Sequence, residues 1–402
     1  MNVPLWIARR YFFSRRKRSF ISLISLISML GVGVGTMALV VVLSVFNGME
    51  ELNRAIFKTF DPDLTVLPRD GKRLAVTPKM LQTIQQTDGV EFVTQVIEDN
   101  ALARYGNGQM VVKVKGVDNS FLRRREMDTT LTDGRLRLME ESVQFANVAE
   151  GVRLTLLISP EDVLTPLELW YPKNNRSINL LSEDSFSQQY FTVSGVFNIE
   201  RSYDNYVIVP LSSARQLVGY GPTQLSKLET QLRPGTDVEE LKETLQRQLG
   251  ESVRVQTRDD LNADLLRAIR FEKLFVTVTL AFLVLVAGIN IFFSLSMLAI
   301  EKKDDVEILV AMGAEPGFIR RIFLAEGAIV ALTGAVVGLI LGVGICLLQE
   351  RYGFVSMGMQ NSLIDAYPVK LEPGDLALTT VIVVLVTFFV SWIPARRASR
   401  RL

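Results

Sequence analysis

Four long runs of apolar residues divide the chain. Residues 20–46 carry no charged side chain, and Glu326 is the single charged residue within residues 275–300, 322–348 and 376–394. A helix needs about 20 apolar residues to cross the hydrocarbon core of a bilayer. The first run is also longer than the ~7–15 apolar residues of a cleavable signal peptide. We therefore predict four transmembrane helices.

Clusters of basic residues lie next to these runs at three places in the chain. They are Arg9, Arg10, Arg15, Arg16, Lys17 and Arg18 before the first run, Lys302, Lys303, Arg320 and Arg321 between the second and third, and Arg396, Arg397, Arg400 and Arg401 after the last. The positive-inside rule places these segments, and so both termini, in the cytoplasm. The long segment between the first two runs then lies outside, because long domains are translocated regardless of their charge.

The predicted fold is a polytopic α-helical membrane protein with a large α/β extracytoplasmic domain between its first and second transmembrane helices. Its first segment combines Trp6 with other aromatic and basic residues, as in a helix that lies on anionic lipid. The predicted segments are an interfacial helix (1–19), transmembrane helices (20–46, 275–300, 322–348, 376–394), an external domain (47–274), a cytoplasmic helix (301–321), an external loop (349–375) and a cytoplasmic tail (395–402).

The external segment alternates between strand and helix patterns. Strand, helix and strand patterns occur at residues 63–67, 78–86 and 90–97, and again at residues 227–233, 237–249 and 252–257. Two such units around an insertion indicate one subdomain built from both ends of the segment. The insertion alternates apolar and polar residues over short runs, which predicts mostly β structure.

Composition restricts the chemistry. The 44 basic and 43 acidic side chains give a net charge of +1, which indicates no nucleic-acid partner. The chain has no histidine and one cysteine, Cys346, which excludes histidine-based catalysis, intrachain disulfides and cysteine metal clusters. It also lacks the G-x-x-x-x-G-K-[ST] loop that binds phosphate. We therefore predict no catalytic residues, no bound cofactor and no metal site, so any energised work requires a separate ATPase.

The connection between the second and third apolar runs contains a short amphipathic helix. Val306, Leu309 and Val310 share one helical face, and a glycine followed by a proline ends the helix. Apolar residues on a cytoplasmic connector favour docking to another protein, although a solvated connector is the alternative. The residues assigned to coupling are Val306, Leu309, Val310, Met312 and Gly313.

Three segments carry recognisable motifs. Residues 33–50 read GVGTMALVVVLSVFNGME, residues 267–273 read RAIRFEK, and residues 301–313 read EKKDDVEILVAMG. Together with the order of the apolar runs, these motifs resemble the LolC/LolE family of lipoprotein-releasing ABC permeases, within the wider FtsX- and MacB-like permeases. The resemblance covers nearly the whole chain and does not distinguish a LolC-like from a LolE-like subunit.

The resemblance implies partners and a location. In such systems two permease subunits, identical or not, bind a pair of LolD-like ATPase subunits that carry ATP and magnesium. The system extracts a lipoprotein from the bacterial inner membrane and passes it to a periplasmic carrier, LolA. The external domain would then lie in the periplasm, in contact with the carrier.

Gly334, Gly338 and Gly342 form a small-residue stripe in the third run, which favours close helix packing.

The first apolar run suggests a path for the acyl chains. The outer half of the first run could line an acyl-chain cavity, with helix packing as the alternative. The predicted cavity residues are Met37, Val40, Val41, Leu43, Phe46, Asn47 and Met49.

Residues 172–189 form a long polar interruption of the external domain. Polar loops of this length usually have a function or are disordered. We expect this loop to bind the carrier through main-chain and apolar contacts; a loop without a partner is the alternative. The residues assigned to this contact are Pro172, Ile178, Leu180 and Leu181.

Two other classes of function remain open at this point. One is an FtsX-like mechanotransmitter, which would activate a cell-wall hydrolase without moving a substrate. The other is a membrane-anchored receptor or enzyme, against which the absence of histidine and of any nucleophile–base pair counts. A P-loop ATPase partner would support both permease functions, and lipoprotein crosslinking would separate them.

Overall fold

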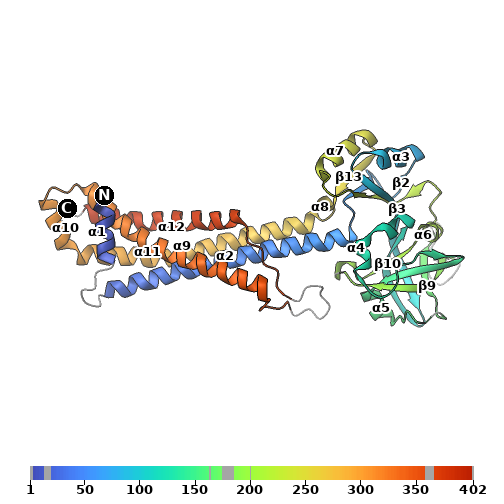
Figure 1. Ribbon diagram of the computed structural model, residues 1–402, viewed down its shortest axis with the longest axis horizontal. Helices are drawn as coiled ribbons and strands as arrows, with labels where there is room; N and C mark the ends of the chain where they lie inside the picture. Colours follow the sequence, from blue (N-terminus) through green and yellow to red (C-terminus); the bar gives the residue numbers. More distant parts are fainter. Residues whose placement is uncertain are drawn as a thin grey trace. The chain divides into compact units, whose positions relative to one another are not determined.

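The computed structural model describes residues 3–12, 20–162, 164–173, 185–199, 201–357 and 366–400 (Figure 1). The chain divides into two compact units. One comprises Met1–Leu52 with Asp264–Leu402, and the other comprises Asn53–Ala263. We call them the helical unit and the sheet unit.

The helical unit is built from long helices. Four described helices are long and apolar enough to cross a membrane: α2, α9, α11 and α12. Their bounds, with those of the two shorter helices, are α1 (Val3–Phe12), α2 (Phe20–Phe60), α9 (Ala263–Glu301), α10 (Lys303–Ala311), α11 (Pro316–Tyr352) and α12 (Pro373–Arg400).

Two of these helices extend beyond their apolar runs. α2 continues to Phe60, so it passes along the chain from the helical unit into the sheet unit, and α9 begins at Ala263, where the chain leaves the sheet unit. The predicted span boundaries at residues 46 and 275 therefore do not mark helix ends. An apolar run marks the part of a helix that suits hydrocarbon, whereas backbone hydrogen bonds continue through charged residues such as Glu50 and Arg54.

The glycine stripe of α11 packs directly against α2. A Cβ atom on Gly338 would lie 2.2 Å from the carbonyl oxygen of Gly33, and one on Gly334 would lie 2.4 Å from that of Met29. Helix packing, rather than an open surface, therefore accounts for the small residues on this face. A hydrogen bond of 2.7 Å between the hydroxyls of Ser25 and Ser294 adds a contact from α2 to α9.

Eleven of the described strands in the sheet unit form one sheet, in the main order β13-β1-β12-β3-β4-β10-β7-β9-β5, with β6 and β8 paired beside it. β4 and β10 are parallel, as are β7 and β9, and the other pairs are antiparallel. The strands are β1 (Leu64–Pro68), β3 (Val90–Tyr105), β4 (Gly108–Val117), β5 (Leu131–Gly134), β6 (Met139–Glu140), β7 (Val143–Ala149), β8 (Leu167–Pro172), β9 (Phe186–Phe197), β10 (Tyr206–Pro210), β12 (Lys227–Leu232) and β13 (Val253–Thr257); β2 (Leu74–Ala75) pairs separately with β11 (Gln224–Leu225).

Strands from the two ends of this unit meet in the sheet. β1 pairs with both β12 and β13, although more than 150 residues separate β1 from β12 in the chain. Helices cover the sheet: α3 and α7 pack on β3 and β13, whereas α5 and α6 pack on β4. The helices are α3 (Pro78–Gln86), α4 (Arg125–Asp128), α5 (Glu150–Leu156), α6 (Leu211–Val218), α7 (Val238–Leu249) and α8 (Arg258–Leu261).

Local sequence explains where the covering helices begin. The side chain of Thr77 caps α3 by accepting a hydrogen bond from the amide of Met80, and Pro78 occupies the first turn. Asp237 caps α7 in the same way, through the amides of Glu239 and Glu240. Such caps satisfy backbone amides that have no partner inside the helix.

Candidate functional site

The short cytoplasmic helix of the sequence prediction is α10, and one of its apolar residues faces inward. Val306 is only 7% exposed and packs with Leu298, Ile319 and Phe323. The prediction that Val306 is available to a partner is therefore wrong. Its side chain fills a small core formed by α10 and the adjacent ends of α9 and α11.

Other apolar residues at this end of the helical unit are exposed. Ile308 is 60% exposed and Met312 is 79% exposed, and Val310 is exposed to a smaller extent. Gly313 follows with a φ of +92°, a conformation that favours glycine, and ends the helix. We call Ile308 and Met312, which lie four residues apart, the docking face.

The half-buried Leu309 contributes to a groove between α10 and α1. The groove has a volume of about 280 Å³ and is lined by Trp6, Ile7, Arg10, Asp305, Ile308 and Leu309. Its walls are mostly apolar, with one cation and one anion among the lining residues. It could accept an apolar side chain carried by a polar segment.

The residues predicted to line an acyl-chain cavity separate into two groups. Val40, Leu43 and Asn47 are buried inside the chain, so the prediction that they line an open cavity is wrong. Their spacing of three to four residues turns them toward the other helices, and a Cβ on Gly342 would lie 3.0 Å from Val40 Cβ. The remaining residues, Met37, Val41, Phe46 and Met49, are half-buried.

Asn47 belongs instead to a polar cluster that joins three helices. Lys273 Nζ of α9 lies 2.7 Å from Asn47 Oδ1 and 2.9 Å from Asp375 Oδ2 of α12. The amide of Asn47 also donates to Asp375 Oδ2 at 2.7 Å. Beside it, the backbone amide of Lys370 donates to the carbonyl oxygen of Ser44 at 2.9 Å. We call Asn47, Lys273 and Asp375 the three-helix cluster.

The predicted carrier-binding residues lie at the junction of β8 and β9. Pro172 is the last residue of β8 and pairs with Phe186 of β9. The backbone amide of Lys173 donates to the carbonyl oxygen of Ser185 at 2.8 Å, which closes the antiparallel pair. Ile178, Leu180 and Leu181 lie outside the described residues.

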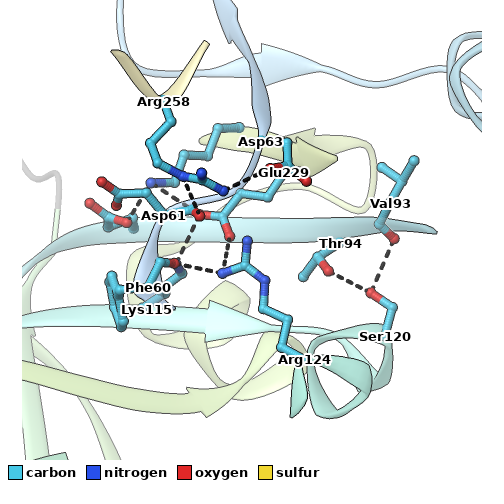
Figure 2. A network of polar contacts seen from close by, with 12 residues as sticks. Phe60, Asp61, Asp63, Val93, Thr94, Lys115, Ser120, Arg124, Glu229 and Arg258 are labelled. Atoms are coloured by element: carbon cyan, nitrogen blue, oxygen red, sulfur yellow. Dashed lines mark hydrogen bonds and ion pairs between the residues drawn. The ribbon is translucent and has the colours of Figure 1, made fainter. Parts of the chain in front are cut away.

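Sequence reasoning did not find the polar network in the middle of the sheet (Figure 2). Lys115 and Glu229 are each 1% exposed and form an ion pair of 2.9 Å. Lys227 and Arg124 lie 3.3 and 3.7 Å from the same carboxylate. Lys227 also pairs with Glu98 at 2.7 Å. We call these five residues the polar network.

The charges of the polar network hold its carboxylates ionised. Burial alone would raise the pKa of Glu229, but Lys115, Lys227 and Arg124 together lower it to about 2. Glu98 behaves similarly: burial is outweighed by neighbouring lysines, and its pKa is also about 2. Neither group has the pKa near neutrality that suits a general acid or base. The network therefore has a structural role, since its ion pairs join β3, β4 and β12 of the sheet.

No group of three or more His, Cys, Asp or Glu side chains arranged to hold a metal ion occurs among the described residues.

Two family descriptions match the sequence. Residues 25–248 match the MacB-like periplasmic core domain, and residues 277–401 match the C-terminal region of FtsX-like permeases. The first match alone covers more than half of the chain.

Relatives are similar over almost their full length. The chain is 24% identical to the lipoprotein-releasing system transmembrane protein LolE of Haemophilus influenzae, covering 100% of this chain and 98% of the relative. It is also 24% identical to the LolC protein of Neisseria meningitidis serogroup B, covering 99% and 97%. A crystal structure of the periplasmic region of MacB from Actinobacillus actinomycetemcomitans aligns with a TM-score of 0.38 at 12% identity, covering 52% of this chain and 95% of that one.

Proposed function

Because the chain belongs to the LolC/LolE family of ABC permeases, within the wider FtsX- and MacB-like permeases, we propose that it extracts lipoproteins from the inner membrane and delivers them to a periplasmic carrier. The observation that carries the proposal is the end-to-end similarity to both LolE and LolC proteins. The chain supplies the membrane helices and the external domain, and a separate subunit hydrolyses ATP. Both termini and α10 then face the cytoplasm.

The docking face and the neighbouring groove are the proposed contact with the ATPase. Exposed apolar side chains at a helix end lose unfavourable contact with water when a partner covers them. Ile308 belongs to both features, since it is exposed and also lines the groove with Trp6. Val306 stabilises the position of α10 by packing with Ile319 and Phe323 of α11.

The proposed acyl-chain contact is the half-buried face of α2. Met37, Val41, Phe46 and Met49 are apolar and lie at spacings of three to five residues. The opposite face of α2 is filled by the glycine stripe of α11, which leaves no room there for a lipid chain. Covering acyl methylenes on this face would recover part of the ~0.8 kcal/mol per CH₂ group that is lost on leaving the bilayer.

The external domain is proposed to reach the carrier through the junction of β8 and β9, beginning at Pro172. An exposed strand junction can bind a partner by main-chain hydrogen bonds as well as by side chains. The two permease positions of the complex are filled either by two copies of this chain or by this chain and a related one.

The test is ATP-dependent transfer of a lipoprotein from liposomes that contain the assembled complex to a soluble carrier. Met312→Glu should weaken binding of the ATPase at least tenfold, because the contact would bury an unpaired carboxylate. Leu154→Glu is the matched control, since Leu154 is an exposed leucine of the sheet unit and its replacement should leave ATPase binding unchanged. ATPase binding by Met312→Glu at wild-type affinity would refute the docking face.

The FtsX-like match over residues 277–401 supports one alternative, a mechanotransmitter that moves no substrate. The same assay separates the two functions. ATP hydrolysis by a complete complex without any lipoprotein transfer would favour the mechanotransmitter, whereas transfer that depends on ATP supports the lipoprotein-releasing function.

A further inference from the structure

The residue that follows α2 is hydrogen-bonded to the residue that precedes α9. α2 ends at Phe60, and α9 begins at Ala263. The residue after α2 is Asp61, and the residue before α9 is Asn262. The amide of Asn262 donates to Asp61 Oδ2 at 2.8 Å. One side-chain hydrogen bond therefore links the end of α2 to the start of α9.

Asp61 is also bonded to the body of the sheet unit. The hydroxyl of Tyr203 donates to Asp61 Oδ2 at 3.0 Å. Arg258 Nε donates to the carbonyl oxygen of Asp61 at 3.3 Å, and Arg258 Nη2 donates to Asp63 Oδ1 at 2.7 Å (Figure 2). Asp63 in turn accepts a bond of 2.9 Å from the amide of Leu232 in β12. The bonds around Asp61 thus continue into the central strands.

Phe60, the last residue of α2, contacts two residues of the polar network. Its carbonyl oxygen accepts a hydrogen bond of 2.6 Å from Arg124 Nη1, and Lys115 Nζ lies 4.2 Å from the centre of its ring. The rings of Tyr203 and Tyr206 pack around it at 4.6 and 4.8 Å between centroids. A helix end held by hydrogen bonds, a cation and aromatic packing at once cannot pivot without breaking several contacts.

The start of α9 is fixed from its own side. Thr257 and Asp260 form a reciprocal capping box at the start of α8, which directly precedes α9. Asp259 of α8 also forms an ion pair with Arg54 of α2, and about half of the Asp259 side chain is exposed. This outer pair joins α2 to α8, but water screens it.

We infer that Asp61, Asn262, Tyr203 and Arg258 form a joint that makes the ends of α2 and α9 move with the sheet as one body. This inference rests on the proposed function and deepens it. α2 runs without interruption from the helical unit into the sheet unit, and α9 begins at Ala263, the last residue of the sheet unit. A displacement that ATP hydrolysis produces in these helices then reaches the external domain as movement, rather than as local bending at the helix ends. Asp61 is a positioning residue in this scheme, because it acts through the helix ends that it holds.

The experiment separates a coupling role from a purely structural one. Asn262→Asp places two carboxylates where an amide now donates to a carboxylate, and their repulsion should open the joint. The exchanged double variant, Asp61→Asn with Asn262→Asp, restores an amide–carboxylate pair with the donor on the other side. Asp259→Asn is the control, because it removes only the screened ion pair.

Each variant is assembled into the full complex in liposomes, and two quantities are measured: ATP hydrolysis and lipoprotein released per ATP hydrolysed. We expect Asn262→Asp to keep ATP hydrolysis within twofold of wild type and to lower release per ATP at least fivefold. The exchanged double variant should recover at least half of the release, and Asp259→Asn should release normally.

A second experiment measures the rigidity of the joint, as a distance between two spin labels, without any substrate. Cys346 is the sole cysteine, so Cys346→Ala gives a background for spin labels at Lys58 of α2 and Glu243 of α7. The distance between the labels should have a narrow distribution in this background, a broad one with Asn262→Asp, and a narrow one again in the exchanged double variant. A narrow distribution with Asn262→Asp, wild-type release per ATP by that variant, or no recovery in the exchanged variant would overturn the inference. If the wild-type complex releases no lipoprotein, the proposed function fails, and the label distances alone decide whether the joint exists.

Discussion

Replacing Glu229 by glutamine removes one negative charge from a site where three cations converge. Lys115, Lys227 and Arg124 all lie within 4 Å of this carboxylate, and Lys115 is almost completely buried. Glutamine keeps the shape of the side chain and its carbonyl oxygen. The substitution therefore tests the charge and not the packing.

The structure gives the size of the expected effect. A lowering of the pKa of Glu229 from 4.5 to about 2 corresponds to roughly 3 kcal/mol of preference for the ionised form. Removing one partner of a buried ion pair typically costs about 3–5 kcal/mol. Lys227 keeps its second partner, Glu98, so the lower end applies. We expect Glu229→Gln to reduce the stability of the sheet unit by about 3 kcal/mol.

Hydrogen exchange of the backbone amides of β12 in the full-length, detergent-solubilised protein measures this loss directly. The matched control is Glu251→Gln. Glu251 also pairs with an arginine, Arg69, at 3.2 Å, but its side chain is 94% exposed. A screened surface pair contributes little, so the control should exchange at the wild-type rate.

The dependence on pH gives an independent check. Because the folded pKa of Glu229 is lowered, its stabilising contribution is fully present above the unfolded pKa of about 4.5 and is lost as the pH falls toward 2. Glu98, with a pKa also about 2, follows the same direction. The wild type should lose stability more steeply than Glu229→Gln over this range. Equal stability of the two proteins at neutral pH would show that the buried charge is not required.

Two further sets of substitutions test the helical unit. Gly338→Val should lower the thermal stability of the solubilised protein sharply, because a Cβ there would lie 2.2 Å from a backbone oxygen of α2. Gly344→Ala should not, because no neighbouring atom lies within 4 Å of a Cβ at that position. Similar melting temperatures for the two variants would contradict the packing argument. Lys273→Met should lower the melting temperature by leaving Asp375 without its cation, and adding Asp375→Leu should recover part of the loss. No recovery would mean that the ion pair itself, rather than the uncompensated charge, matters.

Hydropathy predicts which residues can cross the membrane but not where a helix stops. The apolar runs correspond to α2, α9, α11 and α12, yet α2 continues to Phe60 and α9 starts at Ala263. The continuation is amphiphilic rather than apolar, with Glu50, Arg54 and Lys58 among its residues. Helix propensity is similar for charged and apolar straight-chain residues. The number of apolar residues in a segment therefore does not indicate how far its helix continues beyond the apolar run.

The pattern of α10 indicates an amphipathic helix but not which partner covers it. Val306 and Leu309 lie on the same predicted face, and both are at least half-buried by other parts of this chain. Ile308 and Met312, outside that face, are more exposed than Val310, which lies on it. Periodicity identifies a face that prefers to be buried, and tertiary structure decides whether the burial is internal.

The polar network left a signal in the sequence that pattern reasoning did not use. Lys113 and Lys115 alternate with apolar residues in β4, and Lys227 and Glu229 do so in β12. Alternate residues of a strand share one face, so each strand presents two charges on the same side. Charges on a predicted half-buried strand suggest a water-facing side, and only the pairing of β3 with both strands brings these charges together.

Besides the bond between the hydroxyls of Ser25 and Ser294, two hydrogen bonds connect α2 and α9, one between the helices and one between the residues next to their ends, and together they restrict how these helices can move. Asn47 bonds to Lys273 at 2.7 Å, and Asp61 accepts from Asn262 at 2.8 Å. Along α2 these residues are about 21 Å apart at 1.5 Å per residue, and along α9 they are about 17 Å apart. Sliding one helix past the other by a turn, about 5.4 Å, would break both bonds at once. A movement that keeps both bonds must carry α2 and α9 together, and it is this paired movement that the joint at Asp61 would deliver to the sheet.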